Sequence, residues 1–225
     1  MIVRNWMNSK PHTITPDVLV TEAKRILSEE NLRALPVVDA DGRLRGLVTR
    51  AICLRAGENV MRAQDPFEID YFTKRLKVKD VMVRNPATVN ADDPMEHCLF
   101  RGQQDRMSQF PVLDKGRVVG ILSASEVFRL AAKILGAWEN WSGITLKVGA
   151  KEKGDLSRIA AIVDEAGAVL TSLYAVARGD AGARRIIVRF TGADAEGLAQ
   201  VYRAAGYTVA EVSANVCEGR PKQVA

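Results

Sequence analysis

The chain contains an internal repeat, and this duplication constrains the fold more than any single motif does. Three segments recur in the same order: residues 3–14 as 78–89, residues 35–39 as 110–114, and residues 46–49 as 120–123. The offset is 75 residues at the start (78 − 3) and 74 at the end (120 − 46), so the second copy is one residue shorter in the turn between. Because repeated units bury their apolar faces against each other, the duplication predicts two similar half-modules packed as a pair.

The composition is that of a globular protein with more than one core. The chain has 225 residues, of which 47% are hydrophobic and 26% are charged, and two domains are the ordinary expectation for this length. No apolar run approaches the roughly 20 residues of a membrane helix, and the first residues lack the apolar segment of a signal peptide. Cys53, Cys98 and Cys217 form no metal-ligand pattern and are expected to be reduced thiols in a cytoplasmic protein.

The charge balance argues against a dedicated nucleic-acid surface. The formal net charge is +5, from 32 Lys and Arg against 27 Asp and Glu, and the basic residues are scattered among the acidic ones. A nucleic-acid binder should gather its basic residues on one face or interleave them with aromatic side chains. The small excess suits anionic small ligands, and contact with DNA or RNA remains a minor alternative.

Each copy is predicted to fold as strand, helix, strand, strand, helix. In the first copy, strands are predicted at residues 13–14, 35–38 and 44–48. A helix with one apolar face is expected to begin at Pro16 and Asp17, and Asp41-Gly42 is a hairpin signal. Thr49 is expected to cap a final helix that Gly57 ends.

The second copy repeats this pattern from Val78 to about Leu135 with one difference. Ile26-Leu27, on the apolar face of the first helix, correspond to Arg101-Gly102 in the second copy. Glycine inside a helix costs about 1 kcal/mol relative to alanine and removes a core side chain here. The sequence therefore predicts that this helix is looser or shifted in register. Residues 58–77 are expected to form a linker with some structure of its own.

Residues 142–216 are predicted to form a separate domain of mixed α+β type. The expected elements are a strand at 144–148, a helix from Asp155 to Gly167, strands at 169–177 and 184–191, a helix at 198–205 and a strand at 207–212. This βαββαβ order is typical of the ferredoxin-like fold, an antiparallel sheet with both helices on one side. Residues 217–225 are expected to be a polar tail.

The end of each repeat suggests a ligand site. A glycine and two apolar residues are followed by Thr49 in the first copy and Ser123 in the second, each opening a helix. A hydroxyl beside the free N–H groups of a helix start suits phosphate, and an acid one turn later suits a ribose diol. The second copy has Glu126 at that place, whereas the first has Ile52. The alternative is that Thr and Ser are present only as helix caps.

Both repeats resemble CBS domains. Their pattern of Met-x-x-x-Pro-x-Thr-Val, Leu-Pro-Val-Val-Asp and Gly-Ile-Val-Thr matches residues 7–14, 35–39 and 46–49, and again 82–89, 110–114 and 120–123. The resemblance covers residues 1 to about 137, with repeats at 1–57 and 78–137. It implies a pseudo-symmetric pair, a Bateman module, which in that family binds AMP, ATP or S-adenosylmethionine in clefts between the repeats.

The remainder resembles an ACT domain, a βαββαβ module that often binds amino acids at dimer interfaces. Its usual Pro-Gly-x-Leu entry to the first helix corresponds to residues 153–156, with Lys153 in place of the proline. The combined domain order is similar to the acetoin-utilisation protein B family, in which the module is regulatory.

The resemblance implies one functional adenosine site in the second repeat. Its expected residues are Thr88, Phe110, Pro111, Val112, Ser123, Ser125 and Glu126. Ser123 and Ser125 would lie near phosphate and Glu126 at the ribose. The corresponding residues of the first repeat are Thr13, Pro36, Val37, Thr49 and Arg50. Arg50 and Arg84 are additional candidates for phosphate contacts, and the first cleft lacks the family's acid because of Ile52.

These observations predict a non-enzymatic, homodimeric sensor of an adenosine-type ligand, with an amino acid as a possible second effector. His12 and His97 belong to no catalytic or metal-binding cluster, and no cofactor or metal is expected. Two alternatives remain: a ligand-free dimerisation module, supported by Ile52 and by Arg101-Gly102, and a nucleotide-processing enzyme.

Overall fold

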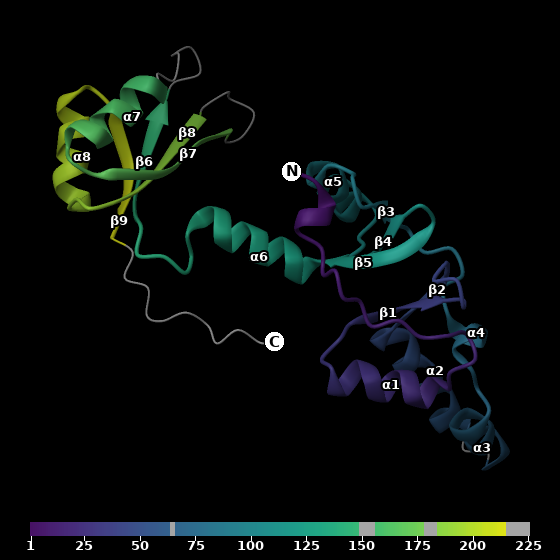
Figure 1. The fold of residues 1–225 in the computed structure, drawn as a ribbon. Coiled ribbons are helices and arrows are strands. Elements are labelled where there is room, and N and C mark those ends of the chain that lie inside the picture. The colour runs from purple at the N-terminus through teal and green to yellow at the C-terminus, as the bar shows by residue number, and fades with distance from the viewer. Residues whose placement is uncertain (64–65, 149–155, 178–183, 215–225) are drawn as a thin grey trace. The chain divides into compact units, whose positions relative to one another are not determined.

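A computed structural model describes residues 1–63, 66–148, 156–177 and 184–214, which form two compact units, Met1–Arg129 and Leu130–Ala225 (Figure 1). The predicted tail at 217–225, Cys217 and the segment 153–155 lie outside the described residues. No helix in the described part of the chain is long and apolar enough to cross a membrane.

The first unit contains both repeats as far as Arg129, which lies within the last helix of the second repeat. The first repeat consists of η1 (Val3–Asn5), α1 (Val20–Glu29), β1 (Ala34–Val38), β2 (Leu44–Thr49) and α2 (Arg50–Ala63). The linker carries α3 (Pro66–Lys74). The second repeat consists of α4 (Val78–Val81), β3 (Val89–Asn90), α5 (Met95–Gln104), β4 (Gln109–Asp114), β5 (Arg117–Ser123) and α6 (Ala124–Leu135). The strands β1 and β2 pair antiparallel, as do β4 and β5.

Two predicted helix boundaries in the first repeat are wrong. Helix α1 begins at Val20, not at Pro16, because the preceding residues bond to the start of the second repeat: the N–H of Lys79 donates to the Pro16 carbonyl (2.9 Å) and that of Val78 to the Val18 carbonyl (2.8 Å). Helix α2 continues through Gly57 to Ala63, with Gly57 packed near Phe72.

The predicted register shift in the second repeat is also wrong. Helices α1 and α5 have ten residues each, and both of their ends are separated by 75 residues (95 − 20 and 104 − 29). Gly102 therefore occupies the place of Leu27 in an intact helix. The backbone after each helix is the same too, since the N–H of Leu32 donates to Leu27 and that of Met107 to Gly102, both at 2.9 Å.

The segment that precedes the core of each repeat pairs with the other repeat. We call these segments, residues 3–8 and 78–83, the leading segments. Asn8 and Ile121 exchange two backbone hydrogen bonds (3.0 and 3.1 Å), and so do Leu47 and Val83 (2.9 and 3.0 Å). The two pairs are equivalent, because Asn8 corresponds to Val83 and Leu47 to Ile121. The residues before the first repeat's core thus pair with the last strand of the second repeat, and the residues before the second repeat's core pair with the last strand of the first repeat.

The contacts along the two leading segments obey the same twofold-like relation. Arg4 forms an ion pair with Asp92 (3.0 Å), and the equivalent Lys79 forms one with Asp17 (2.9 Å). Residues Arg43 and Arg117, which are themselves equivalent, form a β-bridge with each other. A contact between equivalent positions must lie on the axis that relates the copies, so the half-modules meet around this bridge.

Glycines at the crossing points make room for the exchanged segments. A Cβ at Gly120 would lie 2.5 Å from Met7 Sδ and 2.8 Å from the Asn8 carbonyl oxygen. A Cβ at Gly46 would lie 2.6 Å from Met82 Sδ and 2.8 Å from the Val83 carbonyl oxygen. The repeated glycine of the sequence motif is therefore a backbone-packing requirement of the paired fold.

The second unit is a helix-covered sheet in its described part. Its elements are β6 (Ser142–Val148), α7 (Leu156–Glu165), β7 (Val169–Ala177), β8 (Arg184–Thr191), α8 (Ala195–Ala204) and β9 (Thr208–Ser213). The sheet order is β7-β8-β6-β9, and every neighbouring pair is antiparallel. Alternate strand residues such as Ile144 and Val188 pack with Ile159 of α7 and Leu198 of α8 in one core, and both helices lie on the same face (Figure 1).

Tyr202 ties α8 to α7 inside this core. It is fully buried, and its hydroxyl donates to the Ile159 carbonyl oxygen at 2.7 Å. Burial, and then the nearby Tyr207, raise the pKa of Tyr202 above its ordinary value. The neutral phenol is consequently the form that the folded unit accommodates.

The Tyr202→Phe variant is expected to lose about 1 kcal/mol of unfolding free energy at neutral pH, because the buried hydrogen bond from the Tyr202 hydroxyl to the Ile159 carbonyl is removed. The folded pKa is raised, so the stabilisation is present below the unfolded pKa of about 10 and declines as the pH rises beyond it. Urea unfolding between about pH 8 and pH 11 should therefore show the wild-type advantage shrinking. An advantage that stays constant across this range would contradict the assignment.

Candidate functional site

The two helix-start turns predicted from the repeats are present at β2–α2 and β5–α6. In the first, Thr49 Oγ1 accepts from the N–H of Ile52 at 3.3 Å. In the second, Ser123 Oγ accepts from the N–H of Ser125 at 3.2 Å. Both hydroxyls therefore satisfy free N–H groups of the helix start, as caps do.

Glu126 is the buried acid of the second turn. Only 8% of it is exposed, and it is the one buried charged residue recorded within the described ranges. Its Oε2 accepts from the N–H of Ser123 at 2.8 Å and makes a short hydrogen bond with the Ser123 hydroxyl. This is a capping box, in which the third helical residue bonds back to the cap. In the first repeat, the equivalent Ile52 packs against the apolar core.

The other predicted residues of the second repeat are spread over its sheet. Phe110, Pro111 and Val112 are buried on β4, and Ser125 is exposed at the start of α6. Thr88 precedes β3, and its carbonyl oxygen accepts from Arg101 Nη1 at 3.0 Å.

Their counterparts in the first repeat have comparable exposure. Pro36 and Val37 are buried on β1, and Thr13 is exposed. Arg50 does not face solvent freely, because its Nη2 donates to the Leu27 carbonyl oxygen at 2.8 Å. Arg84 is exposed and donates to the Lys79 carbonyl oxygen at 3.3 Å. Arg50, one of the two arginines predicted to contact phosphate, thus bonds the backbone of its own repeat.

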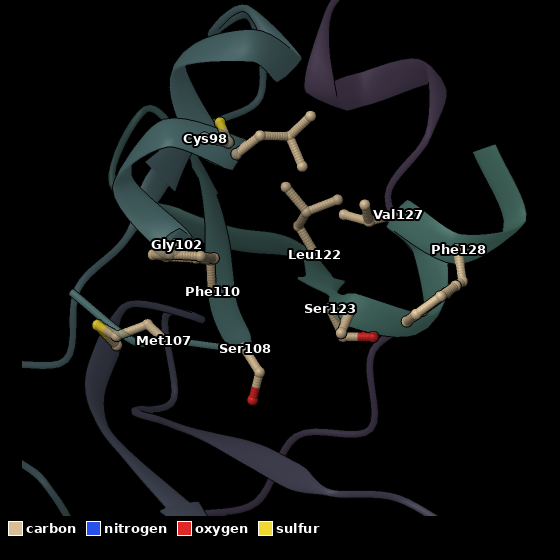
Figure 2. Close-up of a pocket in the computed structure, with 11 residues that line it drawn as sticks. Cys98, Gly102, Met107, Ser108, Phe110, Leu122, Ser123, Val127 and Phe128 are labelled. Atoms are coloured by element: carbon tan, nitrogen blue, oxygen red, sulfur yellow. The ribbon is translucent and has the colours of Figure 1, made fainter. Parts of the chain in front are cut away.

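A pocket of about 180 Å³ lies within the second repeat (Figure 2). It is lined by Cys98, Leu99, Gly102, Met107, Ser108, Phe110, Leu122, Ser123, Ala124, Val127 and Phe128. Figure 2 shows Cys98 and Gly102 of α5 on one side and Val127 and Phe128 of α6 on the other. Of the predicted site residues, the pocket brings together only Phe110 and Ser123.

The pocket exists because two positions carry smaller side chains than in the first repeat. Gly102 corresponds to Leu27, which is fully buried, and Ala124 corresponds to Arg50. In the first repeat the Arg50 side chain reaches the backbone of this helix position, since its Nη2 donates to the Leu27 carbonyl oxygen. Phe110, which replaces Leu35, takes up part of the freed space: its Cε2 would lie 3.4 Å from a Cβ at Gly102.

The chemistry of the pocket is that of an apolar binding surface. Its hydroxyl groups are those of Ser108 and Ser123, and the latter is bonded to Glu126. Burial, with a smaller contribution from the nearby Asp93 carboxylate, raises the pKa of Cys98, so this cysteine remains a thiol at neutral pH. The described residues include no group of three His, Cys, Asp or Glu that could hold a metal ion.

Sequence reasoning missed most of this pocket although one signal was present. Gly102 interrupts an apolar helical face, and a core position without a side chain leaves space unless a neighbour fills it. The residue was interpreted as a weakness of the helix, whereas the helix is intact and the space is retained. Ala124 by itself does not indicate a pocket in the sequence. Its importance becomes clear only because the equivalent Arg50 bonds the Leu27 carbonyl oxygen of its own repeat.

Comparison with known proteins assigns the repeats. The CBS domain family model matches residues 3–59 and 78–133, just over half of the chain. A CBS domain-containing protein of Dictyostelium discoideum is 27% identical over 136 residues, 60% of this chain and 94% of that protein. L-aspartate semialdehyde sulfurtransferase of Methanocaldococcus jannaschii is 28% identical over 130 residues, 57% of this chain but only 23% of the enzyme.

The paired repeats are also similar in fold to solved structures. The complex of CBSX2 with AMP is 26% identical, with a TM-score of 0.51, and covers 60% of this chain and 98% of that one. A Vibrio cholerae protein named for acetoin utilization (AcuB) is 23% identical, with a TM-score of 0.54, over 60% of this chain and 95% of that chain, a likeness of fold.

Proposed function

Because the chain belongs to the CBS domain family, we propose that it is a regulatory protein without catalytic activity that senses an adenosine-type ligand, AMP, ATP or S-adenosylmethionine, in its paired repeats. The observation that carries the proposal is the exchange of leading segments, which joins two half-modules around a twofold-like bridge and repeats the hydroxyl-bearing helix start in both. A relative with the same paired fold holds AMP in its solved structure.

The second repeat is the proposed ligand-binding half. Glu126 and Ser123 form a hydrogen bond with each other, and a ligand could supply each of them with a new partner. Ribose hydroxyls would donate to the Glu126 carboxylate in place of Ser123, and the released serine hydroxyl would then donate to a phosphate beside the start of α6. The helix N-terminus favours the negative charge there. Thr88, Ser125 and the β4 residues Phe110, Pro111 and Val112 complete the proposed site.

The first repeat is proposed not to bind the nucleotide in the same way. Ile52 stands at the position of Glu126 and cannot accept a hydrogen bond from a sugar. Arg50, the nearest cation of that helix start, is bonded to the Leu27 carbonyl oxygen. One adenosine ligand per chain is therefore expected.

The C-terminal unit is proposed to be a ferredoxin-like domain of the ACT type, in keeping with the resemblance to the acetoin-utilisation protein B family. Its βαββαβ order and its antiparallel β7-β8-β6-β9 sheet support this assignment. Lys147 and Arg185 lie directly opposite each other on β6 and β8, and neither forms an ion pair with any described residue. Like charges so placed repel each other, which suits a carboxylate-bearing effector such as an amino acid.

A second candidate function is a ligand-free dimerisation module. The capping box favours this function, because Glu126 has a structural partner without any ligand. Ile52 also favours it, because this residue packs against the apolar core of the first repeat. An enzymatic role has less support: His12 lies at the surface with Glu30 at 3.9 Å, and the pKa values of Cys53 and Cys98 are raised by burial.

A thermal-shift screen of the full chain with AMP, ATP, S-adenosylmethionine and the common amino acids tests the proposal. A ligand that binds only the folded state stabilises by mass action, so about 100 times its dissociation constant should add about 2.7 kcal/mol. At least one adenosine compound is expected to raise the unfolding temperature. A dimer whose unfolding temperature responds to none of them would instead support the ligand-free module.

A further inference from the structure

We propose that the pocket between α5 and α6 binds a small neutral molecule that combines an apolar ring or branched chain with one hydroxyl group, as phenol does. The pocket lies at the place where the first repeat holds the Arg50 side chain, and the molecule would take over the volume and the hydrogen bond of that side chain. This site is additional to the proposed adenosine site, because Glu126 does not line the pocket and the Ser123 hydroxyl is already bonded to Glu126.

The polar feature of the pocket is the carbonyl oxygen of Gly102, one of the last four carbonyl groups of α5, which a helix leaves without internal partners. The equivalent carbonyl oxygen of Leu27 accepts two hydrogen bonds, one from a backbone N–H (2.9 Å) and one from Arg50 Nη2 (2.8 Å). In the described part of the chain the Gly102 oxygen accepts only from the N–H of Met107 (2.9 Å). Ala124 stands in place of Arg50 and has no side-chain donor. Because a carbonyl oxygen has two lone pairs, Gly102 can accept one further hydrogen bond.

The free acceptor is reached through the pocket. Gly102 of α5 and Ala124 of α6 both line it. In the first repeat the Arg50 side chain crosses the equivalent space, from the start of α2 to the last turn of α1. A donor that approaches Gly102 from the side of Ala124 therefore lies in the pocket.

The size and the lining of the pocket suit such a molecule. Its volume is about 180 Å³, and an apolar cavity of roughly 150 Å³ in a protein interior accepts benzene. Phe128 at the rim is 76% exposed (Figure 2) and Leu99 is 40% exposed, so the pocket opens to solvent and a ring can enter. No Asp or Glu lines the pocket, so a neutral hydroxyl suits it better than an ammonium group, which would bury a charge without a partner.

The space is retained although a neighbour is larger than in the first repeat. Phe110 replaces Leu35 and approaches Gly102, but it fills only part of the volume that the missing side chains leave. An unfilled apolar cavity destabilises a core in proportion to its volume. A molecule that fills this one should therefore stabilise the folded second repeat by mass action.

Calorimetric titration of the full chain with phenol and with toluene, which has the same shape but no donor, tests the proposal. Burying a hydroxyl without a partner costs about tenfold or more in affinity, so a pocket without a free acceptor would favour toluene by that factor. With the Gly102 carbonyl as acceptor, phenol is expected to bind saturably and with an affinity within about threefold of that of toluene.

Two variants at one position locate the binding. Ala124→Arg restores the donor of the first repeat, and Ala124→Met fills the pocket without a donor. Each should lower the affinity for phenol by about tenfold or more, because the volume is no longer available. Ala131→Arg is the matched control, since Ala131 is exposed on the same helix and does not line the pocket. This control should bind phenol as wild type does.

Three results would overturn the proposal. They are the absence of binding by either compound, phenol binding at least about tenfold weaker than toluene, and folded Ala124→Arg and Ala124→Met chains that bind phenol as tightly as Ala131→Arg. None of these results bears on adenosine binding at Glu126, which the titration with AMP tests separately.

Discussion

Replacing Gly120 by alanine is expected to lower the unfolding free energy of the N-terminal unit by about 2–3 kcal/mol. The added Cβ would lie 2.8 Å from the Asn8 carbonyl oxygen, a contact closer than real Cβ atoms adopt. The Met7 side chain can move aside, but the carbonyl cannot, because it accepts from the N–H of Ile121 in the exchange of leading segments. Gly46→Ala should have a similar cost, since it meets the Val83 carbonyl oxygen in the same way.

Gly57→Ala is the matched control for this prediction. Gly57 lies inside α2, and its added Cβ would be 3.5 Å from Phe72, an ordinary van der Waals contact. This variant should gain about 0.5–1 kcal/mol from helix propensity. Urea unfolding followed by far-ultraviolet circular dichroism measures all three variants. Equal effects of Gly120→Ala and Gly57→Ala would show that the leading segment does not cross at Gly120.

Replacing Glu126 by alanine is expected to weaken AMP binding by about tenfold or more, because the ligand loses a charged acceptor for its ribose hydroxyls. The same change removes the capping box and should cost about 1 kcal/mol of stability without ligand. The two effects are separable, since the first is read from the AMP-induced rise in unfolding temperature and the second from the unfolding temperature itself.

Glu96→Ala provides the comparison. Glu96 is the acid in the first turn of α5, exposed and in the same repeat, but outside the β5–α6 turn. Its removal should leave the AMP response intact. If Glu126→Ala lost stability but kept the full AMP-induced rise in unfolding temperature, the carboxylate would only cap the helix and would not bind the ligand.

The paired architecture was predictable because the sequence contains the repeat. The exchange of leading segments between the repeats was not predictable. Asn8 and Val83 sit at equivalent places in the two copies, and local patterns do not reveal which copy each one pairs with. Contacts between the repeats also explain the wrong start of α1. Pro16 and Asp17 are typical of a helix start, but the carbonyls of this segment accept hydrogen bonds from the first residues of the second repeat.

The candidate site was predictable only in its turns. Ser123 and Glu126 have the spacing of a capping box, which is readable from sequence, although the acid was interpreted solely as a ribose partner. The pocket depends on Gly102 and Ala124 together, and its existence follows from what Leu27 and Arg50 do in the other repeat. Such a comparison requires coordinates for both copies.

Calorimetric titration of the full chain with AMP is the most direct test of the adenosine-sensing account. The account predicts a saturable heat with one AMP bound per chain, because the second repeat carries Glu126 and the first carries Ile52 at the same place. No heat with AMP, ATP or S-adenosylmethionine would contradict the sensing function, and two equivalent sites per chain would contradict the assignment of the site to the second repeat.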